Sequence, residues 1–109
     1  MSVGYYIESV TGIPVQVDDV LIWAEWFTAT GDGRIVQKDF VGETEVSTVF
    51  LGLDHNHEDN GLPILYETLV FGGPLNNEMW RYTTRDAAEA GHAEVLKRVQ
   101  EAQGAIPLP

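Results

Sequence analysis

Two runs of β-branched, aromatic and aliphatic residues, separated by a short polar segment, limit the fold of this chain more than any other feature. The first run covers residues 46–54 and the second covers residues 63–71. The segment between them is rich in Asn, Asp and Gly. Such runs favour extended backbone and such segments favour turns. The pattern predicts two antiparallel strands that form a central hairpin.

The other predicted strands are shorter. Residues 5–10 and 34–41 contain many β formers, and each range predicts a strand. Residues 75–82 follow a Gly-Gly-Pro sequence and predict an irregular connection. With the central hairpin, these ranges predict an antiparallel sheet of three or four strands.

Two helices are predicted, one before the central hairpin in the sequence and one after it. Residues 18–28 predict a short helix with Asp18 as its N-cap, and a strand over the same residues is the alternative. Apolar residues lie on several sides of this helix, so we expect it to be covered on more than one side. Residues 85–103 carry one apolar face, follow the capping pair Thr83-Thr84 and precede Gly104, which predicts a longer helix. The expected fold class is α+β, with the 85–103 helix packed on one face of the sheet.

Composition narrows the functional classes. The chain has 109 residues, which we expect to form a single domain, 1–109. It contains no cysteine, so disulfides and thiolate metal sites are excluded. Its net charge of −11 disfavours direct nucleic-acid binding and suits a partner protein with a basic surface. No segment has the pattern of a membrane span or signal peptide, so we expect a cytoplasmic protein without a membrane partner.

A buried acid–histidine pair is the most specific structural prediction. If residues 51 and 65 pair, Glu67 lies on the same face of the hairpin as Leu65 and Leu69. We expect the 85–103 helix to cover this face, with His92 on its apolar side. A buried carboxylate needs a partner, so a Glu67–His92 pair is predicted. Such a pair is either a structural contact or a group for proton transfer or ligand binding.

The opposite face of the hairpin is predicted to be buried as well. It carries Phe50, Tyr66 and Val70, which are too apolar to face water. We expect the 18–28 helix or a second subunit to cover it, which leaves a homodimer open.

The loop after the first central strand contains metal-ligand residue types. Asp54, His55 and His57 lie within four positions, and His-x-His beside carboxylates is able to bind a divalent ion. The spacing matches no closed structural site, so no metal or other cofactor is predicted. The alternative is that Asp54 accepts backbone N–H groups and shapes the turn.

Trp80, Arg81 and Tyr82 form a candidate recognition cluster. These residue types are enriched at interface hot spots. The alternative is that Trp80 and Tyr82 pack beneath the start of the 85–103 helix.

Four sequence segments resemble a family of small uncharacterised proteins of bacteriophages and prophages. They are VSTVFLGLDH (46–55), ILYETLVFGG (64–73), RYTT (81–84) and EAGH (89–92), with weaker similarity over 17–27. The resemblance covers most of the chain from about Pro14 to Val99. It implies a phage or prophage context, and it implies no catalytic residues.

Three functional classes follow from these observations. The preferred one is a phage-type small acidic accessory protein, a non-enzymatic binding or inhibitory module on a host or defence factor. The alternative is a protein that binds or sequesters a small nucleotide-like ligand between helix and sheet. The third class is a hydrolase or metal-dependent enzyme that uses Asp54, His55, His57, Glu67 and His92.

Overall fold

The computed structural model describes residues 4–56 and 61–104, and within them it confirms the α+β fold class. A small sheet pairs β1 (Tyr6–Glu8) with β2 (Pro14–Gln16). Helix α1 (Val20–Thr30) follows, and a 3₁₀ turn (Gly31–Arg34) leads into the main sheet. That sheet consists of β3 (Ile35–Val41), β4 (Thr44–Phe50), β5 (Tyr66–Phe71) and β6 (Met79–Tyr82). Helix α2 (Arg85–Gly104) completes the described chain.

The main sheet is antiparallel throughout, in the order β3-β4-β5-β6. Val49 pairs with Glu67 and Phe50 with Tyr66, and the Leu51 N–H donates to the Leu65 carbonyl at 2.7 Å. The predicted hairpin and its register are therefore confirmed. The segment predicted to be irregular contains β6, so the sheet has four strands.

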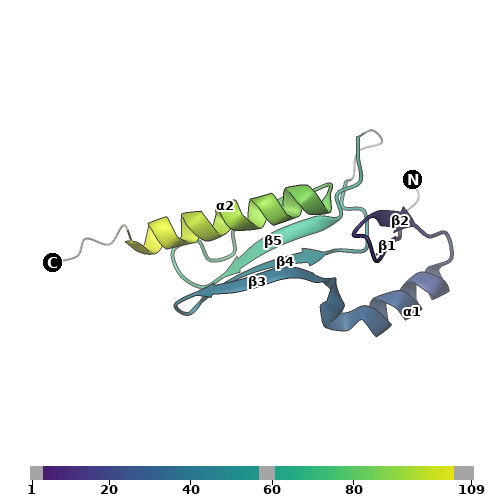
Figure 1. Cartoon of the computed structure of the whole chain (residues 1–109), viewed down its shortest axis with the longest axis horizontal. Helices are drawn as coiled ribbons and strands as arrows, with labels where there is room; N and C mark the ends of the chain where they lie inside the picture. Colours follow the sequence, from purple (N-terminus) through teal and green to yellow (C-terminus); the bar gives the residue numbers. More distant parts are fainter. Residues whose placement is uncertain (1–3, 57–60, 105–109) are drawn as a thin grey trace.

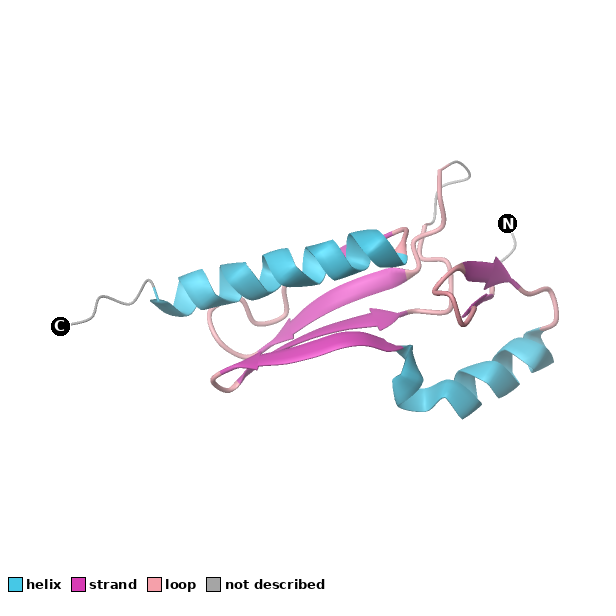
Figure 2. Cartoon of the chain, in the orientation of Figure 1, coloured by secondary structure: helices cyan, strands magenta, loops and turns pink. Residues whose placement is uncertain are grey.

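Helix α2 lies along one face of the main sheet (Figure 2). It contributes a narrow buried stripe of Ala88, His92, Val95 and Val99. The two valines pack with Val46 and Val70 of the sheet, and Ala88 packs in a second cluster with Phe50, Leu65 and Tyr66. These residues form the core between one helix and one sheet face.

Helix α1 projects beyond the end of β3, away from α2 (Figure 1). Its N-cap is Asp19, one residue after the predicted Asp18, and the carboxylate accepts N–H bonds from Leu21 and Ile22. One side of the helix is anchored by Trp23, whose indole N–H donates to the carbonyls of Tyr6 and Gly52. The molecule is therefore elongated, with dimensions of 58 × 30 × 21 Å.

Candidate functional site

The predicted Glu67–His92 pair is wrong. Glu67 lies on the face of the sheet that points away from α2, where its carboxylate accepts a hydrogen bond from Arg81 Nε at 3.1 Å. His92 lies on the opposite face and is fully buried. The register was right and the choice of covered face was wrong.

The error in the covered face has a physical cause. Leu65 and Leu69 suggested that their side of the hairpin was the apolar one, but Leu65 lies outside β5 and Leu69 is only half-buried. Within the strands, the larger buried side chains are Phe50 and Tyr66 on the other side. That side was expected to meet the 18–28 helix or a second subunit, and it meets α2 instead.

A chain of polar side chains, with Thr48, Thr68 and His92 buried at its centre, runs between the sheet and α2. The Tyr82 hydroxyl donates to Thr68 Oγ1 at 3.0 Å, and Thr68 and Thr48 share a hydrogen bond of 2.5 Å. Thr48 Oγ1 lies 2.7 Å from His92 Nδ1. His92 Nε2 lies 2.8 Å from a carboxylate oxygen of Asp39. The chain thus links β6, β5, β4, α2 and β3.

The Asp39 carboxylate only accepts, so His92 donates to it through Nε2. At the other end of the chain, the Tyr82 hydroxyl donates to Thr68. With a neutral imidazole, Nδ1 accepts from Thr48, and Thr48 accepts from Thr68. The hydrogen bond from His92, supported by one from Gln37, lowers the pKa of Asp39 below its ordinary value of 3.8.

The Thr48–His92–Asp39 arrangement has the residue types of a nucleophile, a base and an orienting acid. A nucleophile must reach a substrate, however, and Thr48, Thr68 and His92 are fully buried. The cluster therefore serves to satisfy polar groups and to fix α2 on the sheet.

Close packing of α2 on β6 depends on Gly91. A Cβ atom at this position would overlap the aromatic ring of Tyr82. Gly91 precedes His92 in the EAGH segment, and Tyr82 belongs to the RYTT segment. Thr84 of the same RYTT segment accepts a hydrogen bond from the Ala87 N–H at the start of α2. The EAGH and RYTT segments therefore meet at one helix–strand contact.

Hydrogen bonds from backbone N–H groups to the Asp54 carboxylate hold the Asp54 loop together. One Asp54 carboxylate oxygen accepts N–H bonds from Asn56 at 2.8 Å and Ile64 at 2.9 Å, as the turn-shaping alternative predicts. His55 Nδ1 bonds to the Leu53 carbonyl at 2.8 Å. His57 lies outside the described residues. Within 4–56 and 61–104, no group of three or more acidic or histidine side chains is arranged to hold a metal ion.

The predicted recognition cluster is divided between two faces because residues 79–82 form a strand. Trp80 and Tyr82 face α2 and pack against the core, as the packing alternative predicts. Arg81 faces the other way and pairs with Glu67. The three side chains therefore do not form one surface.

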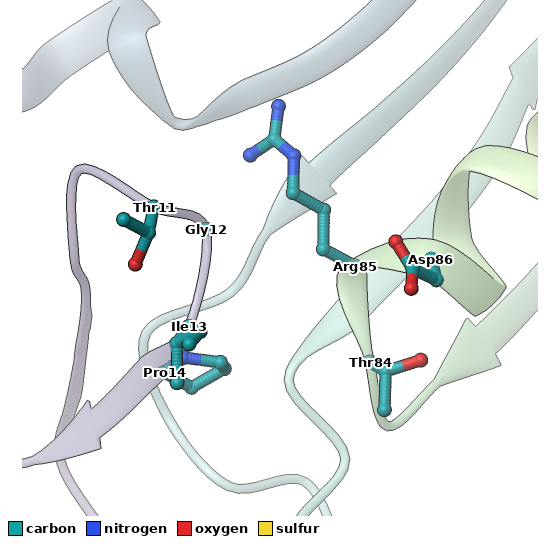
Figure 3. A pocket seen from close by; sticks show the side chains of 7 residues that line it. All are labelled: Thr11, Gly12, Ile13, Pro14, Thr84, Arg85 and Asp86. Atoms are coloured by element: carbon teal, nitrogen blue, oxygen red, sulfur yellow. The ribbon is translucent and has the colours of Figure 1, made fainter.

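A cavity of about 300 Å³ lies between the β1–β2 turn and the start of α2 (Figure 3). Thr11–Pro14 line one side and Thr84–Asp86 line the other. The Arg85 guanidinium is paired with Glu8 at 2.7 Å and Glu89 at 3.3 Å. Glu8 also accepts a hydrogen bond from Tyr66, whose pKa is raised by burial and by this carboxylate. Arg85 therefore has its charge matched within the chain.

Helix α1 carries an apolar surface that the sequence analysis did not identify as a site. No residue of α1 is buried, and the side chains of Leu21 and Ile22 are 72% and 55% exposed. A shallow hollow of about 530 Å³ runs along its solvent side, lined by Leu21, Ala24, Glu25, Thr28 and Ala29. The sequence feature that pointed to this surface was the presence of apolar residues on several sides of the helix. That feature led us to expect that other parts of the protein cover the helix on more than one side.

Comparison with known proteins gives no relative. No model of a protein family matches the chain, and no curated protein or solved structure matches it either. No helix in the described ranges is long and apolar enough to cross a membrane. The resemblance to phage proteins stays a prediction.

Proposed function

We propose that this protein is a small acidic binding module of phage type, and that it inserts α1 into an apolar groove of a host or defence protein in the cytoplasm. The observation that carries the proposal is the exposed apolar surface of α1. Only Glu25, Thr28 and Thr30 of this helix are polar. A helix that is apolar on all sides is normally buried.

The attachment of α1 leaves its outer side free for a partner. Trp23 and Phe27 hold one side of the helix against the body, with Phe27 beside Gly52 and Trp26 edge-on to Phe50. Leu21 and Ala24 lie three positions apart on the solvent side, and Leu21 is largely exposed. Apolar side chains at i and i+3 suit recognition of a helix in a groove.

Acidic side chains surround the exposed apolar surface of α1. Asp18, Asp19, Glu25 and Asp32 lie on or beside α1. The nearby Arg34 guanidinium stacks on the Phe27 ring, 3.5 Å from its centroid. A partner with Lys or Arg around an apolar groove therefore complements α1, and the charge of −11 on the chain assists its approach.

Capture from a bacterial host lysate at low salt tests this proposal. The bait proteins are the unaltered chain, Leu21→Glu, and the control Val10→Glu, which places the same charge on a fully exposed turn residue. We expect the unaltered chain and Val10→Glu to retain one stoichiometric partner, and Leu21→Glu to lose it. The captured amount should fall as salt rises, because the rim contacts are ionic.

Circular dichroism of each bait establishes that the variants fold equally. Capture of no stoichiometric partner in repeated trials contradicts the proposal. Equal capture by Leu21→Glu and the unaltered chain also contradicts it, because the contact then lies outside α1.

A further inference from the structure

We infer that two copies of this chain pack against each other through the open face of the main sheet. The open face is defined here as the side chains of β3–β6 that point away from α2. This surface is separate from α1, and the inference goes beyond the proposed host partner. The dimer and the α1 contact are therefore independent properties.

The open face exposes large apolar side chains beside its charged ones. Phe40 and Phe71 lie on either side of Glu45 across the sheet and are 63% and 45% exposed. Met79, which is 46% exposed, pairs with Leu69, two residues before Phe71 on the same strand. Exposed apolar side chains of this size mark an interaction surface.

Charge favours a second copy as the occupant. The charged side chains on the open face are Lys38, Glu45, Glu67 and Arg81, which sum to zero. The whole chain has a charge of −11, so the excess of negative charge lies elsewhere. A basic partner is attracted to those other surfaces. On the open face, two acidic copies are able to approach without direct repulsion between facing groups.

The outer strands of the sheet disfavour a dimer in which two sheets pair edge to edge. The outer strand β3 is irregular between Ile35 and Gln37, and the outer strand β6 has only four residues. Irregular and short edge strands resist edge-to-edge pairing. Two faces related by a twofold axis, with sheets about 10 Å apart, give a closed dimer.

The size of the face sets the expected affinity. Four strands about 4.8 Å apart and about 20 Å long present roughly 400 Å² of flat area per copy. Two such faces bury roughly 800 Å² in total, which is less than a stable interface buries, so we expect a weak, reversible dimer that forms as concentration rises. Added salt should strengthen it, because salt screens the repulsion between two acidic chains.

Sedimentation equilibrium of the purified chain tests the inference. We expect a monomer–dimer equilibrium in the micromolar to millimolar range. Phe40→Ser should weaken the dimer by about tenfold or more, whereas Val10→Ser, at a fully exposed site off the face, should leave it unchanged. Phe40 is exposed, so this variant should fold, and circular dichroism verifies that.

A second pair of variants changes charge alone. Lys38→Glu places a net negative charge on the open face, and Lys97→Glu makes the same change on the exposed side of α2. We expect only Lys38→Glu to weaken the dimer. The inference is overturned by a monomer at all concentrations, by a dimer equally stable in Phe40→Ser, or by equal effects of both lysine variants. A dimer lost in Leu21→Ser and kept in Phe40→Ser also overturns it. Loss of partner capture in Leu21→Glu with an intact dimer would leave both proposals standing.

Discussion

The two helices of this protein use apolar residues in opposite ways. Helix α2 is mostly polar, yet its narrow stripe of Ala88, His92, Val95 and Val99 is buried and completes the core. Helix α1 is mostly apolar, yet none of its residues is buried. Apolar content therefore does not identify the helix that stabilises the fold. In this chain it identifies the helix with exposed apolar surface, which is where we propose that a partner binds.

Matched serine substitutions in the two helices should give the largest difference. Val95→Ser removes apolar volume from the core and adds a buried hydroxyl, so we expect a loss of about 2–4 kcal/mol in the free energy of unfolding. Leu21→Ser changes an exposed side chain, so we expect a change within about 0.5 kcal/mol. Urea denaturation at low protein concentration measures both. Similar losses for the two variants would mean that α1 is buried in the free chain.

A second test concerns the polar chain beneath α2. His92→Ala removes the hydrogen bonds that His92 makes to Thr48 and Asp39 and opens a cavity, so it should cost about 2–4 kcal/mol. Glu67→Ala removes a partly exposed ion pair with Arg81 and should cost at most about 1 kcal/mol. The two losses should add within about 0.5 kcal/mol in the double variant, because the side chains lie on opposite faces. A larger coupling energy would contradict the face assignment.

The close approach of α2 to β6 gives a third, smaller effect. Gly91→Ala should destabilise the protein by about 1–3 kcal/mol, although alanine favours helix, because its methyl group overlaps Tyr82. Gly104→Ala is the control, since nothing lies near the added atom. In a Tyr82→Leu background, which removes the ring, Gly91→Ala should be close to neutral. A penalty that persists in that background would show that the ring is not the cause.

The sequence was sufficient for the parts of the fold that local patterns determine. Alternating apolar residues and the turn-rich loop predicted the hairpin and its register, and the Thr84 cap with Gly104 predicted α2. The strand at residues 79–82 was missed because MWRY is short and follows Gly-Gly-Pro, and its strand conformation depends on pairing with β5.

The candidate site was predicted less well because it depends on which face of the sheet is covered. Alternation places Thr48 and Glu67 on opposite faces but does not say which face meets α2. Buried threonines decide that question here: Thr48 shares a hydrogen bond with His92 and Thr68 shares one with Thr48, whereas Glu67 lies on the other face. The partner of His92 is Asp39, on a strand far from it in sequence, and no local pattern connects them.

Hydrogen exchange measured by mass spectrometry, on the free chain and on its captured complex, tests the role of α1 most directly. We expect amides of residues 20–30 to become protected in the complex, while those of β4, β5 and α2 exchange as in the free chain. Protection confined to α2 or to the cavity at Thr11–Pro14, with residues 20–30 unchanged, would contradict the assignment of α1 as the contact helix.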